Sequence, residues 1–255
     1  MRASLSALAV AIVFLVLAAS RGGAQGLQDI PVTSSAATGP VVAELFTSQS
    51  CSSCPPAEKL FADLADREGL VVLEWHVDYW DRLIHGRAGA WKDPYSSAAH
   101  TARQRRYNRA LRSTASVYTP QAVINGRSET VGSRLSEVER LLLRNPHTPV
   151  ALQIETKTGT MSAHLPALDQ TLTRAAGVYR LTLLPQQTTA VPSGENRGAV
   201  LTSRNLVIAM ETIGTYSGSE STFEFSAPAS GETCAVIVQA KHGNRLGPIL
   251  AASYC

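Results

Sequence analysis

The stretch VVAELFTSQSCSSCPPAEKLFADLA, residues 41–65, decides the fold. Its first six residues, 41–46, are a short apolar run that predicts a buried strand. After Cys51 and Cys54 come two prolines and then apolar residues at helical spacing. A second apolar run, residues 70–77, predicts another strand. The sequence therefore predicts a strand–helix–strand unit with a Cys-x-x-Cys pair at the first strand-to-helix turn.

A cysteine pair at such a turn is suited to thiol chemistry. The thiolate is the reactive form of cysteine, and the unpaired N–H groups and dipole of a helix start favour negative charge. We expect Cys51 to be the more exposed and more acidic thiol, and Cys54 to resolve a mixed disulfide formed at Cys51. If Cys51 were the N-cap, Pro56 would strain the helix, so the alternative is a helix that begins near Cys54.

A second element of the predicted site is Thr119-Pro120, which precedes a short apolar strand and an Asn125-Gly126 turn. A cis X–Pro bond makes a tight bend. In thioredoxin-like folds such a proline faces the cysteine pair and aligns a substrate's backbone. We predict a cis bond here, with an ordinary trans proline at an edge strand as the alternative.

Ionisable residues follow the second strand, where neighbouring parallel strands end beside one site. His76 can stabilise the Cys51 thiolate, share a metal with both cysteines, or be a hydrogen-bonded core histidine. Asp78 can accept a proton from Cys54 or cap the next turn. Trp80 is expected to form a wall of the site.

Two more helices are expected between the second strand and residue 145. The first covers about 98–111 and carries several arginines, which we interpret as a solvated face, with an anion-docking face as the alternative. The second covers 136–143, with Ser136 as its cap.

The pattern changes after the Pro-containing segment 145–149. Short strands separated by turn residues predict a β-rich, sandwich-like module. Residues 204–212 are ambiguous between strand and helix. We expect strands at 150–155, 178–183, 221–225, 233–239 and 248–252. The predicted domains are an α/β thioredoxin-like domain, 40–146, and a mostly β domain, 147–255.

The remaining two cysteines are expected to form a structural disulfide. Residues 233–241 and 247–252 predict a hairpin, and the midpoint of Cys234 and Cys255 falls at Asn244 and Arg245, inside its turn. The two cysteines are therefore expected to be neighbours, and their bond to contribute about 3 kcal/mol by closing a loop.

The N-terminus predicts export. A positive start is followed by an apolar stretch at 5–17 and small residues, so we expect a signal peptide over 1–24 and a loose lead-in over 25–39, with a retained anchor as the alternative. The mature protein is then periplasmic or secreted, without a transmembrane segment. A net charge of +3 in 255 residues argues against nucleic acid as a partner.

Several motifs, in order, resemble the exported thioredoxin-like proteins grouped as the DUF1223 family. They are Glu44–Gln49, Cys51–Glu58, His76–Asp81, Trp91–Pro94, Arg103–Tyr107, Tyr118–Gln121 and Gly194–Gly198. The resemblance implies a thioredoxin fold followed by a β-rich domain, and it implies no activity.

The residues therefore leave three functions open. The first is thiol–disulfide exchange with exported protein thiols or disulfides, or with an upstream redox partner, with Cys51, Cys54 and Pro120 as the catalytic set and Thr119 in support. The second is copper or zinc handling by Cys51, Cys54 and His76. The third is a binding module that keeps the fold without the chemistry. No other cofactor is expected.

Overall fold

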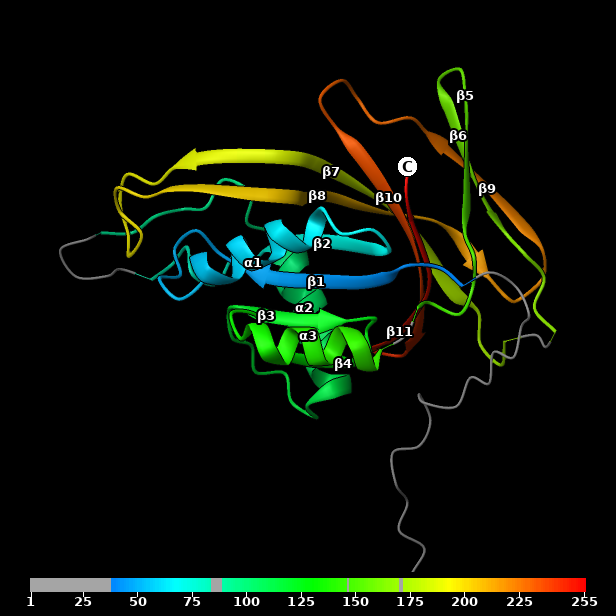
Figure 1. Ribbon diagram of the computed structural model, residues 1–255, viewed down its shortest axis with the longest axis horizontal. Coiled ribbons are helices and arrows are strands. Elements are labelled where there is room, and N and C mark those ends of the chain that lie inside the picture. Colours follow the sequence, from blue (N-terminus) through cyan, green and yellow to red (C-terminus); the bar gives the residue numbers. More distant parts are fainter. Residues whose placement is uncertain (1–37, 84–88, 146, 170–171) are drawn as a thin grey trace, which may run out of the picture.

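The computed structural model describes residues 38–83, 89–145, 147–169 and 172–255, so the expected signal peptide and most of the lead-in lie outside it. The protein has a mixed α/β architecture with an eight-stranded sheet, ordered β11-β10-β7-β8-β2-β1-β3-β4, and a three-stranded sheet, ordered β5-β6-β9 (Figure 1). Among the described residues, no helix has the length and apolar character needed to cross a bilayer.

The predicted strand–helix–strand unit is present. It consists of β1 (Val41–Thr47), α1 (Pro55–Ala65) and β2 (Leu70–His76). The two strands pair in parallel over their whole lengths, and nearly every residue in them is buried. Such burial on both faces explains why each strand is a continuous apolar run rather than an alternating one.

The following elements complete the first half of the chain. They are α2 (Ala98–Leu111), β3 (Gln121–Ile124), β4 (Ser128–Val131) and α3 (Leu135–Arg144). β3 runs antiparallel to β1, and Asn125 and Gly126 form the β3–β4 turn with positive φ angles of 50° and 64°. Ser136 is not the cap of α3, because the helix begins one residue earlier and its N-cap is Arg134.

The prediction of a solvated arginine face on α2 is only partly correct. Arg103 is buried on α2, not solvated, because its guanidinium pairs with Glu44 at 2.8 Å and lies over the rings of Trp75 and Tyr107. Its neighbour Arg105 is half-buried. An arginine inside the fold satisfies its charge on a carboxylate and its planar face on aromatic rings.

The second half is almost entirely strand. Its elements are β5 (Gln153–Lys157), β6 (Thr160–Leu165), β7 (Ala176–Ala190), β8 (Val200–Tyr216), β9 (Ser221–Ser226), β10 (Thr233–His242) and β11 (Arg245–Tyr254). The ambiguous segment 204–212 belongs to β8. The sequence did not predict β6 or the length of the β7–β8 hairpin.

The large sheet continues across the predicted domain boundary. β8 lies parallel to β2, with Glu74 opposite Leu206, and the phenol of Tyr254 in β11 bonds both backbone groups of Val72 in β2. One apolar core joins side chains of β1, β2 and α2 to side chains of β7, β10 and β11. The boundary at 146/147 stays a prediction, but it does not interrupt the sheet.

The second half has a sandwich-like arrangement. Residues of β6 and β9 share a buried cluster with β7, β10 and β11. At its edge a disulfide joins Cys234 to Cys255, with the two Cα atoms 5.2 Å apart. The turn is centred one residue earlier than expected, with His242 opposite Arg245, and irregularities in the β10–β11 pairing shift the register so that the cysteines still meet.

Candidate functional site

Cys51 and Cys54 form a disulfide in the loop between β1 and α1, with their Cα atoms 5.4 Å apart. Cys54 is the N-cap of α1, and Pro55 and Pro56 occupy its first turn. The arrangement with Cys51 as the N-cap is therefore wrong, and the alternative start near Cys54 is the observed one. Prolines fit here because the N–H groups of a helix's first turn have no partner inside the helix. Since a proline has no N–H, however, Pro55 and Pro56 offer no donor to a thiolate.

Both cysteines are fully buried, so the expectation that Cys51 would be exposed is wrong. The Oγ of Ser53, whose residue is exposed, lies 3.3 Å from the Cys51 sulfur. That hydroxyl can donate a hydrogen bond to a thiolate at Cys51, which the helix start itself no longer supplies.

The loop that joins β7 to β8, residues 191–199, contacts the cysteine loop and is called the hairpin tip below (left side of Figure 1). The Asn196 amide donates to the carbonyl oxygens of Gln49 at 2.9 Å and Cys51 at 3.0 Å. The backbone N–H of Ser52 donates to Glu195 Oε2 at 3.0 Å. These residues lie more than 140 positions from the cysteines in sequence, and only the long hairpin brings them there.

Trp91 contacts both the hairpin tip and the cysteine loop. Its indole N–H donates to Gln49 Oε1 at 3.2 Å, and its carbonyl oxygen accepts from the Ser50 hydroxyl at 2.7 Å. Gly194 packs against it, since a Cβ at Gly194 would lie 3.0 Å from the Trp91 Cβ. The cysteine loop is therefore held from two segments distant in sequence.

His76 lies in a buried cluster below this loop, so it is a hydrogen-bonded core histidine. Its Nδ1 is 2.7 Å from Asp93 Oδ2, and its Nε2 is 2.8 Å from Glu74 Oε1 and 3.2 Å from Ser203 Oγ. Burial by itself would lower the pKa of His76, but the carboxylates, Asp93 first, outweigh it and raise that pKa well above its ordinary value. Both ring nitrogens face carboxylate oxygens, so the geometry also favours the imidazolium form of His76.

This placement argues against the predicted metal site at His76, while stabilisation of a Cys51 thiolate by His76 stays a prediction. An imidazolium with both N–H groups donated to carboxylates has no lone pair for a metal ion. In the described part of the chain, no group of three or more His, Cys, Asp or Glu side chains is arranged to hold a metal. Asp93 links His76 to the cysteine loop, since its Oδ2 also accepts a hydrogen bond from the backbone N–H of Gln49 at 2.9 Å.

Glu58 is a buried acid that sequence reasoning missed. It lies four residues after Cys54 on α1, which places both on one face of the helix. Its Oε1 accepts from the Thr47 hydroxyl at 2.7 Å. Burial, assisted by the Glu74 carboxylate, raises the pKa of Glu58 from its ordinary value of 4.5 to about 7. The signal in the sequence was its spacing from Cys54.

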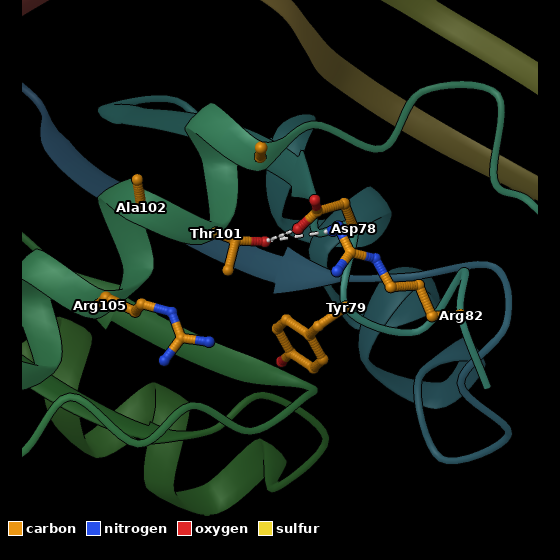
Figure 2. A pocket seen from close by; sticks show the side chains of 7 residues that line it. Asp78, Tyr79, Arg82, Thr101, Ala102 and Arg105 are labelled. Atoms are coloured by element: carbon orange, nitrogen blue, oxygen red, sulfur yellow. Dashed lines mark hydrogen bonds between the residues drawn. The ribbon is translucent and has the colours of Figure 1, made fainter.

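Asp78 faces α2 and hydrogen-bonds within a pocket there. Its Oδ1 accepts from the Thr101 hydroxyl at 2.6 Å, and its backbone N–H donates to that hydroxyl oxygen, Thr101 Oγ1, at 3.2 Å. Figure 2 shows this pair at one side of a pocket between the segment after β2 and α2. The pocket is lined by Asp78, Tyr79, Arg82, Ala98, Thr101, Ala102 and Arg105. The Asp78 carboxylate thus bonds a side chain of α2 rather than capping the next turn, and its predicted proton transfer with Cys54 stays a prediction.

Pro120 lies beside the first turns of α1. The Thr119–Pro120 bond is cis, and β3 begins immediately after it with Gln121 opposite Phe46 at the end of β1. A Cβ at Gly132 would lie 3.4 Å from both the Pro120 and the Ala57 Cβ atoms, which places the proline next to α1. The indole N–H of Trp80 donates to Thr119 Oγ1 at 2.7 Å, so Trp80 supports the bend.

Comparisons with known proteins agree with this architecture. A solved structure of a protein from Agrobacterium tumefaciens is 29% identical, with a TM-score of 0.71, over 86% of this chain and 95% of that one. HBP35 of Porphyromonas gingivalis is similar in fold alone, at 13% identity and a TM-score of 0.54, over 86% of this chain and 76% of that one. No curated protein matches significantly. The pattern of the family described as "Protein of unknown function (DUF1223)" matches residues 42–239. The chain therefore belongs to the DUF1223 family.

Proposed function

We propose that this protein carries a thioredoxin-like unit that exchanges disulfides with cysteine-containing proteins in an oxidising compartment. The observation that carries the proposal is the Cys51–Cys54 disulfide at the β1–α1 turn, with cis-Pro120 beside the same helix. The unit's connections support the thioredoxin-like assignment: β1 and β2 are parallel, β3 and β4 are antiparallel neighbours, and α1 and α3 share a core with β1 and β3.

The exchange conserves sulfur and electrons. A partner thiolate attacks Sγ of Cys51, the Cys51–Cys54 bond breaks, and Cys54 leaves as a thiolate that takes up one proton. A second partner thiol then attacks the mixed disulfide, which releases Cys51 as a thiol and the partner as a disulfide. The protein gains two electrons and the partner loses two, and the reverse sequence oxidises the protein.

Glu58 is the buried acid positioned for the proton step. Its pKa of about 7 keeps a proton near Cys54 at neutral pH, where a carboxyl in water would have lost it. When Cys54 attacks a mixed disulfide in the reverse direction, the carboxylate form of Glu58 can accept the thiol proton. Glu58 therefore acts on Cys54, while Cys51 meets the partner.

Trapping of mixed disulfides tests these roles. The Cys54→Ala variant, expressed in an exporting host and resolved on non-reducing gels, should accumulate partners bound through Cys51. A Cys51→Ala variant is the matched control and should trap none. Trapping by Cys51→Ala instead of Cys54→Ala would reverse the two roles, and trapping by neither would contradict exchange.

A non-catalytic binding module is the second candidate, and the complete burial of both cysteines favours it. In that case the disulfide only holds the loop between β1 and α1, and a Cys51→Ala/Cys54→Ala variant would support growth or partner binding as well as the wild type. Loss of growth support or partner binding in the double variant, with an unchanged fold by circular dichroism, would favour disulfide exchange over the binding module.

A further inference from the structure

The hairpin tip holds one peptide group of the cysteine loop at both ends. The carbonyl oxygen of Cys51 accepts from the Asn196 amide, and the N–H of Ser52, in the same peptide group, donates to Glu195. Backbone groups beside a reactive cysteine are those that an incoming polypeptide can pair with. Here two side chains from the second half of the protein already occupy them.

Access to the Cys51 sulfur requires a movement, since Cys51 has no exposed surface. The hairpin tip is the segment suited to move. Its Glu195 is exposed, and the tip is held by hydrogen bonds of Glu195, Asn196 and Ser193 together with the packing of Gly194 against Trp91. The bonds of Glu195 and Ser193 are exposed and those of Asn196 are half-buried, so they can be exchanged for bonds to water or to another partner.

We propose that Glu195 and Asn196 are specificity-determining residues that select an extended, cysteine-containing polypeptide segment over a small-molecule thiol. The inference rests on the proposed exchange at Cys51. The Ser52 N–H and the Cys51 carbonyl point to opposite sides of one trans peptide group. An extended segment therefore offers a carbonyl oxygen to the Ser52 N–H or an N–H to the Cys51 carbonyl, and it replaces one contact of the hairpin tip as it displaces the tip. A small thiol that lacks peptide groups leaves these groups without a protein partner.

The chemistry of the two contacts supports this substrate class. Glu195 supplies an acceptor and Asn196 supplies a donor, which are the two groups that one stretch of peptide backbone offers. Asn196 also bonds the carbonyl of Gln49, so its displacement releases the loop on the N-terminal side of the cysteines. The same two residues therefore exclude poor partners and mark where a good partner binds.

Reduction kinetics of the full mature chain test the inference. The rate of opening of Cys51–Cys54 is measured with dithiothreitol and with an unstructured dodecapeptide that carries one cysteine, and the ratio of the peptide rate to the dithiothreitol rate is compared between variants. In Asn196→Ala and Glu195→Ala the dithiothreitol rate should rise about tenfold, because the closed tip loses a hydrogen bond. The peptide rate should rise much less, so the ratio falls.

Matched variants separate this effect from general loosening. Glu211→Ala, on the same hairpin but bonded to Arg180, and Asn244→Ala, in an exposed turn, should leave both rates unchanged. Glu195→Gln keeps an acceptor and should retain most of the wild-type ratio. Asn196→Asp gives a second variant without the amide donor if Asn196→Ala folds poorly, as judged by circular dichroism.

The inference is overturned if the Asn196 and Glu195 variants leave both rates unchanged, or if both rates rise by the same factor, because the tip would then not discriminate. These outcomes are distinct from failure of the proposed function, in which the wild-type pair transfers no electrons to or from any protein disulfide.

Discussion

At the scale of single residues, the cysteine loop is positioned by a buried set of charges beneath it. Asp93 accepts hydrogen bonds from His76 and from the backbone of Gln49, and Gln49 in turn contacts Asn196. Glu74 holds the other nitrogen of His76. One imidazolium therefore serves two carboxylates, and Asp93 links its position to the loop carrying Cys51.

Replacement of His76 should destabilise the whole protein. In His76→Gln at least one of the buried carboxylates loses its charged donor, and an uncompensated buried charge costs about 3 kcal/mol or more in the free energy of unfolding. Urea denaturation at pH 7 measures this loss. His242→Gln, in an exposed turn, is the matched control and should change stability little. A loss for His76→Gln as small as that of the control would contradict the charge-balance account.

Glu58 should give the protein a characteristic dependence of stability on pH. Between its unfolded pKa near 4.5 and its folded pKa of about 7, the folded state holds a proton that the unfolded state has released. The contribution of Glu58 to stability therefore falls as pH rises through this window. Glu58→Gln should flatten the fall in Tm between pH 5 and pH 7, measured by differential scanning fluorimetry.

The exposed Glu68 provides the control for that experiment, since Glu68→Gln should keep the wild-type pH profile. Equal slopes for Glu58→Gln and the wild type would show that Glu58 does not titrate in this range.

The sequence predicted some of these residues and not others, for a physical reason. Cys51, Cys54 and Pro120 are recognisable because their chemistry is local to a turn or a bend. Glu58 and Asn196 are polar residues with no distinctive local pattern. The role of Glu58 arises from its burial, and that of Asn196 arises from its contact with a distant segment. His76 was identified, but its two carboxylate partners decide which of its possible roles it has.

At the scale of elements, the β7–β8 hairpin is the feature that connects the second half of the chain to the cysteines. Sequence patterns predicted only part of β7, because its outer residues, 185–190, are mostly polar and mostly exposed and so lack a core-facing apolar stripe. The segment 204–212 was ambiguous for a related reason, since β8 buries few of those residues. The alternation of apolar and polar residues that marks a strand requires one buried face, which the outer part of this hairpin does not have.

Gly194 should control how closely the hairpin tip lies on the cysteine loop. It has φ of +79°, and a Cβ there would meet Trp91 at 3.0 Å, so Gly194→Ala should displace the tip. Hydrogen exchange at the Ser52 amide, which donates to Glu195, should accelerate about tenfold or more as that bond is weakened.

Gly231→Ala is the matched control, because Gly231 has a similar φ of +83° with no atom within 4 Å of the added Cβ. Gly231→Ala should lower stability through the same positive φ without changing hydrogen exchange at the Ser52 amide. Unchanged exchange in Gly194→Ala would show that Trp91 does not set the position of the tip.

At the scale of the whole molecule, the two halves share a sheet and a core. The sequence predicted a boundary at 146/147 from its prolines and from the change from helices to strands. It did not predict that β8 lies next to β2, because pairing between strands so far apart leaves no local pattern. The bond from Tyr254 to Val72 is similarly invisible in sequence.

The shared core should make unfolding a single cooperative transition. Tryptophan fluorescence reports on the first half, since all three tryptophans lie at positions 75, 80 and 91. Hydrogen exchange in β10 reports on the second half. Both probes should give the same denaturant midpoint, as expected for one cooperative unit. Two separated midpoints would show that the halves fold independently.

The most direct test of exchange at Cys51–Cys54 is the reduction potential of that pair. Purified mature protein is equilibrated in glutathione buffers, and the alkylated thiols of Cys51 and Cys54 are counted separately from those of Cys234 and Cys255. Exchange predicts a reversible value between about −270 and −120 mV, the range of catalytic pairs. A pair that stays oxidised below about −300 mV, as structural disulfides do, would contradict the account.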